Sequence, residues 1–344
     1  MAKTMKISSG ILSLLEGKNL SEREAFEFFS RMFKQPEDLA PNKAALLLLA
    51  KKGESSSELV GGIRALRKLE PAKRLRINPL MDTCGTGGDQ SHSINVSTLA
   101  AFVIAGAGVK VAKHGNRALS SKFGSSDLME ALGVRLDASF KTMAGAIQKC
   151  GMGYFHAPSH HPVFSKMQPL RRRLKTRTIF NWMGPLVNPA AVNCQLIGVA
   201  KKEMLPLYAE TLRRLGFNRA AVCHSLDGMD ELSTASPSQV AFINKGKVAF
   251  KRIDPRRFGF KPADRKMFQI SSPRVNKSTV LKLLQGKLRG PKRDLVVFNA
   301  AMGLVVAGKC KNLKKGILLA SKSLDTGRAY QVLVSLKKLS RSGK

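Results

Sequence analysis

The amino-acid sequence predicts an α/β protein in two parts: a small N-terminal α-helical domain and a large α/β domain with a mostly parallel central sheet. Three observations predict this class. Apolar residues recur at helical spacing between about residues 8 and 70, with no strand-like run among them. From residue 78 onward, short apolar runs alternate with helical patterns. A chain of 344 residues, 43% of them hydrophobic, is long and apolar enough to bury such a core.

Three or four short helices account for the N-terminal part. Ser21 suits an N-cap, and Glu24 follows it at the spacing of a capping box. A leucine-rich segment predicts a helix over 40–52, and a glycine break separates it from a further helix over 55–69. A basic link follows these helices. The expected domains are therefore helical over residues 1–75 and α/β over residues 76–344.

Alternating strands and helices account for the second part. Residues 240–270 contain an alternation of apolar and polar side chains around a glycine, which is the pattern of a β-hairpin. Helices after Asp294 complete the domain. Strands are expected within segments 78–84, 108–115 and 220–225, and helices within 97–108, 126–134, 202–216 and 278–290.

Basic residues greatly outnumber acidic ones, with 59 Lys and Arg against 23 Asp and Glu and a net charge of +36. Residues 241–344 hold 26 of the basic residues and 4 of the acidic ones. A surface that binds nucleic acid through its phosphates is one interpretation of this bias. A generally basic surface with no such partner is the other, and both stay open on composition alone.

Composition also excludes some classes of protein. The sequence has no run of the roughly 18–20 consecutive apolar residues that a membrane-spanning helix needs. Its N-terminal apolar run is short and meets Glu16, so a secretion signal is not expected. The five cysteines lie in apolar contexts without metal-ligand spacing, which indicates reduced thiols and a cytoplasmic protein.

A glycine-rich turn follows the first expected strand. Residues 82–89 hold three glycines in four positions, which lets backbone amides approach a phosphate. A helix is expected from about Asn95, and its first amides add a favourable site for an anion. The spacing matches neither a P-loop nor a dinucleotide-binding loop. By itself, this turn fits a phosphate site or an ordinary tight turn.

Three further segments carry polar residues. Lys113, Arg117 and the serines of 120–126 suit a polyphosphate or sugar phosphate, although the segment alone also fits an exposed basic turn. His160 and His161 are adjacent, but no Cys or carboxylate lies at ligand spacing, so zinc is not expected. The third segment suits Mg²⁺ together with substrate phosphates or, alternatively, a solvated acidic turn. It places three carboxylates within five residues: Asp227, Asp230 and Glu231.

Taken together, these segments resemble the anthranilate phosphoribosyltransferase family. The motifs occur in the family's order and at about its separations: GTGGD at 85–89, KHGN at 113–116, RTIFN-x-x-GPL-x-NP at 177–189 and DG-x-DE at 227–231. The resemblance implies an active site in the cleft between the two domains, a segment at about 165–185 that returns to the helical side, and homodimers. It also implies Mg²⁺-dependent transfer of a phosphoribosyl group from phosphoribosyl pyrophosphate to anthranilate, in tryptophan biosynthesis.

The resemblance also implies roles for individual residues, with Lys113 and Arg171 expected to act in catalysis. Anthranilate is expected to contact Gly85, His114, Asn116, His161 and Arg171. Mg²⁺ is expected at Ser97, Asp230 and Glu231. Phosphoribosyl pyrophosphate is expected to contact Gly85, Thr86, Gly87, Gly88, Asp89, Asn95, Ser97, Thr98, Lys113, Arg117 and Ser125.

Two alternatives stay open at this point. One is a basic, nucleic-acid-binding paralogue of the same fold with little or no transferase activity. The other is a related transferase that uses a different aromatic or nucleobase acceptor. The presence of Lys113, Arg171, Asp230 and Glu231 favours an enzyme, because a binding protein has no need of them.

Overall fold

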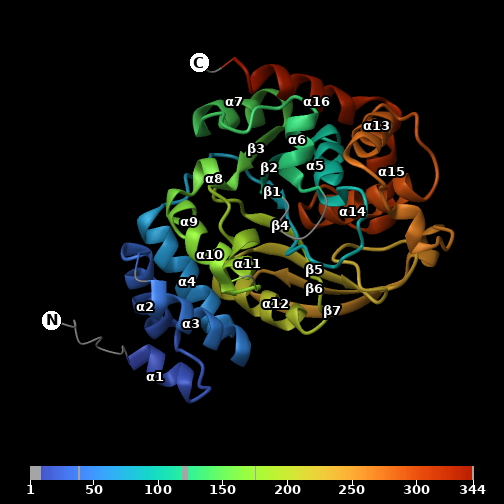
Figure 1. Ribbon diagram of the computed structural model, residues 1–344. Coiled ribbons are helices and arrows are strands. Elements are labelled where there is room, and N and C mark those ends of the chain that lie inside the picture. Colours follow the sequence, from blue (N-terminus) through green and yellow to red (C-terminus); the bar gives the residue numbers. More distant parts are fainter. Residues whose placement is uncertain (1–8, 38, 118–122, 175, 343–344) are drawn as a thin grey trace. The chain divides into compact units, whose positions relative to one another are not determined.

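The chain divides into two compact units in a computed structural model that describes residues 9–37, 39–117, 123–174 and 176–342. Unit 1 comprises residues 1–72 and 161–187, and unit 2 comprises residues 73–160 and 188–344. Helices and a mostly parallel sheet make up the fold, so the predicted α/β class is confirmed. Figure 1 shows both units coloured along the sequence.

Unit 1 is entirely helical among its described residues. Both Ser21 and Ser55 form capping boxes, each accepting from the backbone N–H of a glutamate three residues later, whose carboxylate accepts from the serine N–H. These boxes explain why the helices start where the sequence predicts. The helices are α1 (Ser9–Leu15), α2 (Glu22–Lys34), α3 (Leu39–Lys52), α4 (Ser56–Leu69), α9 (Pro162–Lys166), α10 (Gln168–Leu174), α11 (Ile179–Met183) and a 3₁₀ turn (Gly184–Leu186).

Aromatic rings hold the two stretches of unit 1 together. Phe33 of α2 lies with its ring centroid 6.4 Å from that of Phe164 and 6.0 Å from that of Phe180. Phe164 and Phe180 are themselves 5.8 Å apart, edge to face. The apolar periodicity of α2 therefore buries its stripe against residues far along the chain, which Figure 1 shows as green helices beside blue ones.

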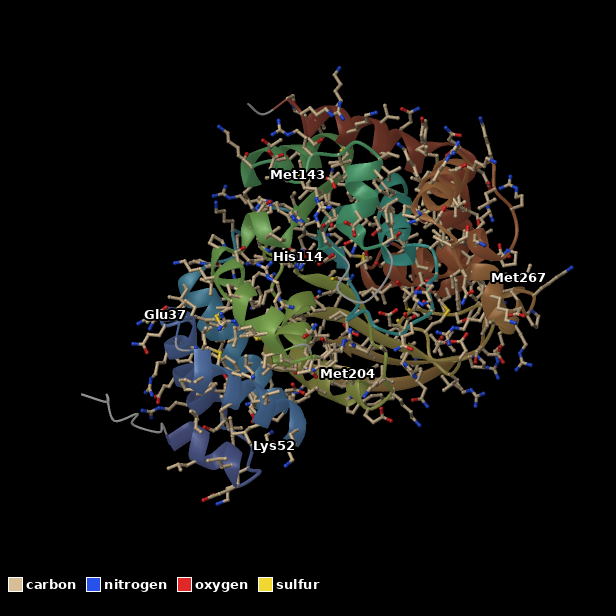
Figure 2. The ribbon with its side chains drawn as sticks, viewed as in Figure 1. Glu37, Lys52, His114, Met143, Met204 and Met267 are labelled. Atoms are coloured by element: carbon tan, nitrogen blue, oxygen red, sulfur yellow. The ribbon has the colours of Figure 1, made fainter. Side chains whose placement is uncertain are left out.

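A buried ion pair also lies within unit 1. The side chain of Glu58 is completely buried, and its carboxylate accepts from Lys52 Nζ at 3.0 Å. The same carboxylate accepts from the backbone N–H groups of Leu20 at 2.9 Å and Ser55 at 2.7 Å. Lys52 ends α3 (Figure 2), Leu20 lies just before α2, and Ser55 caps α4. The Glu58 carboxylate therefore links the ends of three helices.

Unit 2 is built on a seven-stranded sheet of order β3-β2-β1-β4-β5-β6-β7. The first five strands in this order run parallel, and β6 and β7 continue antiparallel. The strands are β1 (Leu80–Thr83), β2 (Lys110–Gly115), β3 (Met152–His156), β4 (Cys194–Gly198), β5 (Arg219–Ser225), β6 (Ser238–Asn244) and β7 (Lys247–Ile253).

Helices α5 and α14 pack against each other and against strands β1 to β5. The helices of unit 2 are α5 (Val96–Gly106), α6 (Ser125–Ala131), α7 (Phe140–Cys150), α8 (Ala157–His160), α12 (Met204–Arg214), α13 (Pro273–Leu284), α14 (Pro291–Val306), α15 (Leu313–Asp325) and α16 (Arg328–Leu339), with 3₁₀ turns at Pro255–Phe258 and Arg265–Phe268. The apolar residues of α5 and α14, buried over most of both helices, form the centre of the core.

The strand order locates a binding edge. Between β1 and β4 the order of connection reverses, because β1 leads outward to β2 and β3 while β4 leads outward to β5. Ligands of open parallel sheets bind beyond the carboxyl ends of the strands at such a reversal. The glycine-rich loop leaves β1 at this point, and its Thr86 N–H donates to the Gly198 carbonyl at the end of β4, 2.9 Å away.

Most predicted elements are confirmed, and two strands were missed. The hairpin turns at Lys245 and Gly246, which both have positive φ as a tight two-residue turn requires. The residue pattern singled out no strand at 152–156 or 194–198. Both strands are buried along their whole length, but so is β1, which was predicted, so burial alone does not distinguish them.

The charge bias is a surface property of unit 2. Many nitrogen-tipped side chains project from residues 241–344 (Figure 2), and nearly all lysines and arginines of α15 and α16 are exposed. Within the part of the chain that the structure describes, no helix is both long and apolar enough to cross a membrane.

Replacing Glu58 by Ala is expected to lower the free energy of unfolding by about 3–5 kcal/mol, because Lys52 would stay buried without its partner. Glu27→Ala is the matched control, since Glu27 pairs with Arg23 on the exposed face of α2 and such pairs contribute little. Denaturant unfolding of both variants measures the difference. Equal effects of the two substitutions would contradict the assignment.

Candidate active site

A buried carboxylate organises the start of the glycine-rich loop. Asp82 of β1 is completely buried and accepts from the His114 N–H at 3.2 Å and from Asn188 Nδ2 at 2.9 Å. Burial raises the pKa of Asp82, and the positive charge of Lys113 opposes this shift. Asn188 also donates to the Ala112 carbonyl at 2.7 Å. The end of β1, the end of β2 and the Asn188 segment are therefore joined through one polar cluster.

The glycine-rich loop packs directly on the acidic loop that follows β5. Gly87 N–H donates to Asp230 Oδ2 at 2.9 Å. A Cβ added to Gly198 would lie 1.4 Å from the Asp230 carbonyl oxygen, so only glycine fits there. A Cβ on Gly85 would lie 3.1 Å from Asp230 Oδ2. These glycines thus permit the close approach of two loops that are more than a hundred residues apart in sequence.

Three carboxylates gather where the loops meet, and Lys113 is close enough to act on their charge. Asp230 N–H donates to Asp89 Oδ2 at 3.3 Å, and Ser97 N–H donates to Glu231 Oε1 at 3.1 Å. Burial, and then the charge of Asp230, raises the pKa of Glu231 well above its usual range, while Lys113 opposes the shift. Three nearby carboxylates with a single opposing ammonium group form a site that favours a further cation.

Asp227, the third acidic residue of the predicted magnesium loop, has a different role from its neighbours. Its Oδ1 accepts from the Met229 N–H at 3.2 Å, and its carbonyl accepts from Arg265 Nη1 at 2.7 Å. These bonds shape the turn. The third carboxylate beside Asp230 and Glu231 comes instead from Asp89 in the glycine-rich loop, a proximity that sequence spacing alone could not reveal.

Lys113 is held in a buried position at the end of β2. Only 1% of its surface is exposed, and its Nζ donates to the carbonyls of Thr83 and His114. A buried ammonium group surrounded by backbone carbonyls keeps a fixed place. It therefore offers a positioned positive charge at the same edge of the sheet as the glycine-rich loop.

Helix α5 begins beside the acidic cluster. Asn95 precedes it, but the Asn95 side chain makes other contacts: Nδ2 donates to the Phe123 carbonyl at 3.2 Å, and Oδ1 accepts from Asn276 Nδ2 at 2.8 Å. Thr98 in the first turn is completely buried. Asn95 gives α5 no side-chain cap, and the Ser97 N–H in its first turn donates to Glu231 Oε1, so the start of the helix is held beside the acidic cluster.

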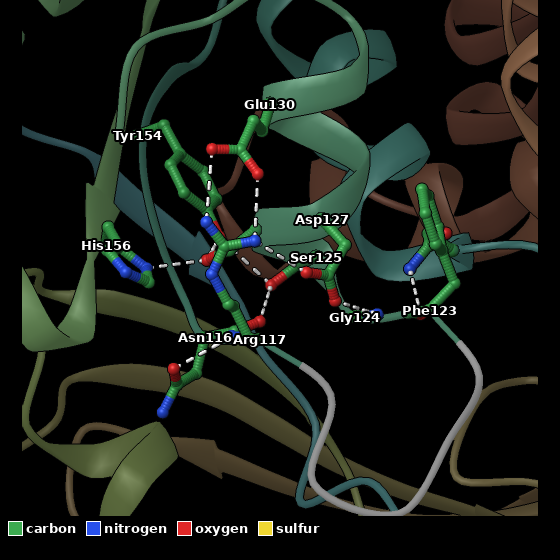
Figure 3. A network of polar contacts seen from close by, with 11 residues as sticks. Asn116, Arg117, Phe123, Gly124, Ser125, Asp127, Glu130, Tyr154 and His156 are labelled. Carbon is green, nitrogen blue, oxygen red and sulfur yellow. Dashed lines mark hydrogen bonds and ion pairs between the residues drawn. The ribbon is translucent and has the colours of Figure 1, made fainter. Parts of the chain in front are cut away.

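The second predicted phosphate segment forms a separate polar network (Figure 3). Arg117 Nη1 lies 2.9 Å from Asp127 Oδ1 and 2.8 Å from Glu130 Oε2, so its guanidinium is engaged by two carboxylates. Ser125 Oγ donates to the Asn116 carbonyl at 3.2 Å. Of the predicted segment, Ser120, Ser121 and Lys122 lie outside the described residues.

Two predicted acceptor-binding residues belong to unit 1. His161 Nδ1 lies 3.0 Å from Glu70 Oε2, which fixes the orientation of the ring. Arg171 is half-buried on α10, and burial lowers the pKa of its guanidinium. His160, by contrast, belongs to unit 2 and places its ring 5.2 Å from that of Phe155. The neighbouring histidines thus have different surroundings.

Among the described residues, no group of three or more His, Cys, Asp or Glu side chains is arranged to hold a metal ion alone. Mg²⁺ has a different requirement, since it commonly takes one or two carboxylates and completes its shell with substrate phosphates and water. Asp230 and Glu231 meet that requirement.

The structure brings together in unit 2 the glycine-rich loop, Lys113, the start of α5, Asp230 and Glu231. Sequence reasoning assigned no role to three residues that hold them in place: Asp82, Asn188 and Gly198. Asn188 lies inside the GPL-x-NP motif, so the motif could have marked it as part of the site. No motif marks Gly198, because glycine is required at this position only through the close approach of Asp230.

Comparison with known proteins identifies the family. Residues 77–330 match the model described as glycosyl transferase family, a/b domain. The anthranilate phosphoribosyltransferase of Desulfosudis oleivorans is 40% identical over 335 residues, covering 97% of this chain and 99% of its own. That of Pelotomaculum thermopropionicum is 40% identical over 330 residues, covering 96% and 95% respectively.

Solved structures agree with the sequence relatives. The crystal structure of anthranilate phosphoribosyltransferase from Thermus thermophilus superposes with a TM-score of 0.91 at 36% identity and covers 97% of this chain and 100% of its own. The enzyme from Saccharomyces cerevisiae in complex with PRPP and Mg shares the fold, with a TM-score of 0.89 at 23% identity. On the family model and the sequence relatives, this chain belongs to the anthranilate phosphoribosyltransferase family.

Proposed function

We propose that this chain transfers the phosphoribosyl group of phosphoribosyl pyrophosphate to the amine of anthranilate, releasing pyrophosphate, as a step of tryptophan biosynthesis. One observation carries the proposal. Glycine-loop amides, the first turn of α5 and buried Lys113 lie at one edge of the sheet, beside the cluster of Asp89, Asp230 and Glu231. Donors for a polyphosphate next to carboxylates for a cation are the two halves of a site for a metal-bound pyrophosphate.

Mg²⁺ fits this donor set. Asp230 and Glu231 would hold it, with Ser97 at the pyrophosphate end. Burial, and then the charge of Asp230, raises the pKa of Glu231, and a divalent cation would offset both effects. The Saccharomyces cerevisiae relative forms a complex with PRPP and Mg, which supports the same choice of ion. When bound, Mg²⁺ would neutralise part of the charge on the pyrophosphate.

The reaction breaks the bond between ribose C1 and the pyrophosphate oxygen, and the electron pair leaves with pyrophosphate. Lys113 and the amides of the glycine-rich loop would stabilise that developing negative charge, and Lys113 is already held in place before the bond breaks. The amine of anthranilate then forms the new C1–N bond from the opposite face and releases a proton to solvent. An aromatic amine is unprotonated at neutral pH, so no strong general base is needed.

Four residues are proposed to bind the acceptor. Arg171 would pair with the carboxylate of anthranilate, since a guanidinium presents two parallel donors to that group. His161, oriented by Glu70, and His114 and Asn116 would guide the ring and its amine. Desolvation of Arg171, seen in its lowered pKa, strengthens an ion pair with a bound carboxylate.

The paralogue without transferase activity is not favoured, because family relatives along nearly the whole chain are named as the enzyme. Nucleic-acid binding by the basic surface, a homodimer and a cytoplasmic location stay predictions.

Purified protein supplied with phosphoribosyl pyrophosphate, anthranilate and Mg²⁺ is expected to consume anthranilate, followed by the loss of its fluorescence. Chelation with EDTA should stop the reaction, and added Mg²⁺ should restore it. No loss of fluorescence with all three components present would overturn the proposed function.

Asp230→Asn and Glu231→Gln are each expected to raise the Mg²⁺ concentration needed for half-maximal rate roughly 10- to 100-fold, since a charge-assisted contact contributes roughly 1.5–3 kcal/mol. Asp227→Asn is the matched control in the same loop, because an amide oxygen can still accept from the Met229 N–H. Titration of the rate with Mg²⁺ measures the shift. An unchanged requirement in both test variants would refute these assignments.

Arg171→Ala is expected to raise the KM for anthranilate roughly 10- to 100-fold through the loss of a charged hydrogen bond, and to leave the KM for phosphoribosyl pyrophosphate nearly unchanged. Arg172→Ala removes the same charge from an exposed neighbour on α10 and serves as control. Steady-state kinetics with each substrate varied distinguishes them. Wild-type behaviour of Arg171→Ala would remove Arg171 from the acceptor site.

A further inference from the structure

Four side chains of unit 2 form a continuous line of polar contacts that ends at the Asn116 carbonyl (Figure 3). His156 Nδ1 lies 2.8 Å from Ser126 Oγ, and Ser126 Oγ lies 2.7 Å from the Tyr154 hydroxyl. The Tyr154 hydroxyl lies 3.1 Å from Ser125 Oγ, which donates to the Asn116 carbonyl at 3.2 Å. The line thus runs from β3 through α6 to the residues that follow β2.

Three of the four side chains in this line are buried. Ser126 is completely buried, and Tyr154 and His156 are 1% and 7% exposed. Buried polar groups are costly unless they are hydrogen-bonded, so each hydrogen on the line must be used. Burial raises the pKa of Tyr154 and, together with the nearby Arg117, lowers the pKa of His156. A protonated phenol and a neutral imidazole are the resulting forms at neutral pH.

Counting hydrogens gives the line a direction. A carbonyl only accepts, so the single Ser125 hydroxyl hydrogen goes to Asn116. Tyr154 must then donate to Ser125, and Ser126 must donate to Tyr154, if every contact is to hold a hydrogen. That leaves Ser126 as an acceptor, so His156 donates from Nδ1. The opposite imidazole tautomer would leave one of the four contacts without a hydrogen.

The line supports the segment that carries the predicted substrate-binding residues. A Cβ added to Gly115 would lie 2.3 Å from Ser125 Oγ and 2.4 Å from the Tyr154 hydroxyl, so both hydroxyls pack closely against the end of β2. The Asn116 carbonyl also accepts from the Ser126 N–H at 3.1 Å. Both of its acceptor positions are thereby occupied, which leaves little freedom of orientation between β2 and the start of α6.

We propose that His156, Ser126 and Tyr154 are positioning residues, which hold Ser125 and Asn116 in their substrate-binding orientation through one directional chain of hydrogen bonds that starts at His156 Nδ1–H. The inference rests on the proposed function, because that function assigns Ser125 to phosphoribosyl pyrophosphate and Asn116 to anthranilate. Bonds that all point one way polarise each other, so loss of one link weakens the whole chain.

The tautomer is tested first, on the unmodified protein. Nitrogen-15 NMR of the six histidines, with His156 assigned by its loss in His156→Asn, is expected to show the proton on Nδ1. A proton on Nε2 alone would overturn the direction of the chain. This measurement needs no catalytic activity, so it stands even if anthranilate is not consumed and the proposed function fails.

Kinetics tests the positioning role. Tyr154→Phe and Ser126→Ala are each expected to raise the KM for phosphoribosyl pyrophosphate about tenfold and to change kcat less than about threefold, because they weaken binding and touch no reacting atom. Tyr330→Phe makes the same chemical change on α16, where Tyr330 packs against the core, and should behave as wild type. Wild-type KM values in both test variants would overturn the proposal.

His156 offers a conservative rescue. An asparagine amide reaches the position of Nδ1, whereas a glutamine amide reaches that of Nε2, so His156→Asn should keep a KM near that of wild type and His156→Gln should not. Equal KM values for the two variants would contradict the role of Nδ1. Thermal unfolding of each variant, with kinetics measured well below its Tm, separates positioning from loss of the fold.

Discussion

A single buried carboxylate, that of Asp82, constrains the edge of the sheet on which the site is built. A charge without solvent must find donors, and Asp82 finds them in the His114 N–H and the Asn188 amide. Those donors come from the end of β2 and the segment before β4, on either side of β1. The hydrogen bonds of Asp82 to these two donors therefore help to position Lys113, the glycine-rich loop and the strand that ends in Gly198.

Acidic and basic side chains are unevenly distributed over the protein. The chain carries a net charge of +36, yet three of its scarce carboxylates, Asp89, Asp230 and Glu231, gather at one edge of the sheet. Like charges so close together raise each other's free energy, and a divalent cation bound with a polyphosphate relieves this repulsion. The excess of lysine and arginine lies elsewhere, mostly on residues 241–344. It therefore says little about the chemistry of the site.

Local patterns predicted much of the fold. The capping box at Ser21, the helix that begins after Ser55 and the turn at Lys245–Gly246 are short-range features, and the structure contains each where the pattern indicates. Strands β3 and β4 were missed, although the equally buried β1 was predicted from its short apolar run. The site followed the same division: the motifs marked its loops, but the pairing of Asp89 with Asp230 and the hydrogen-bonded line from His156 to Asn116 joined residues with no common motif.

The sequence by itself determined the class of fold, the family and the segments that carry the chemistry, because helical periodicity, capping and glycine-rich turns depend on neighbours in the chain. Tertiary structure alone decided which acidic residue joins Asp230 and Glu231, why position 198 must be glycine and which tautomer of His156 satisfies its neighbours. Each of these depends on the approach of groups tens to more than a hundred residues apart. Such approach is set by packing and burial, which no local pattern encodes.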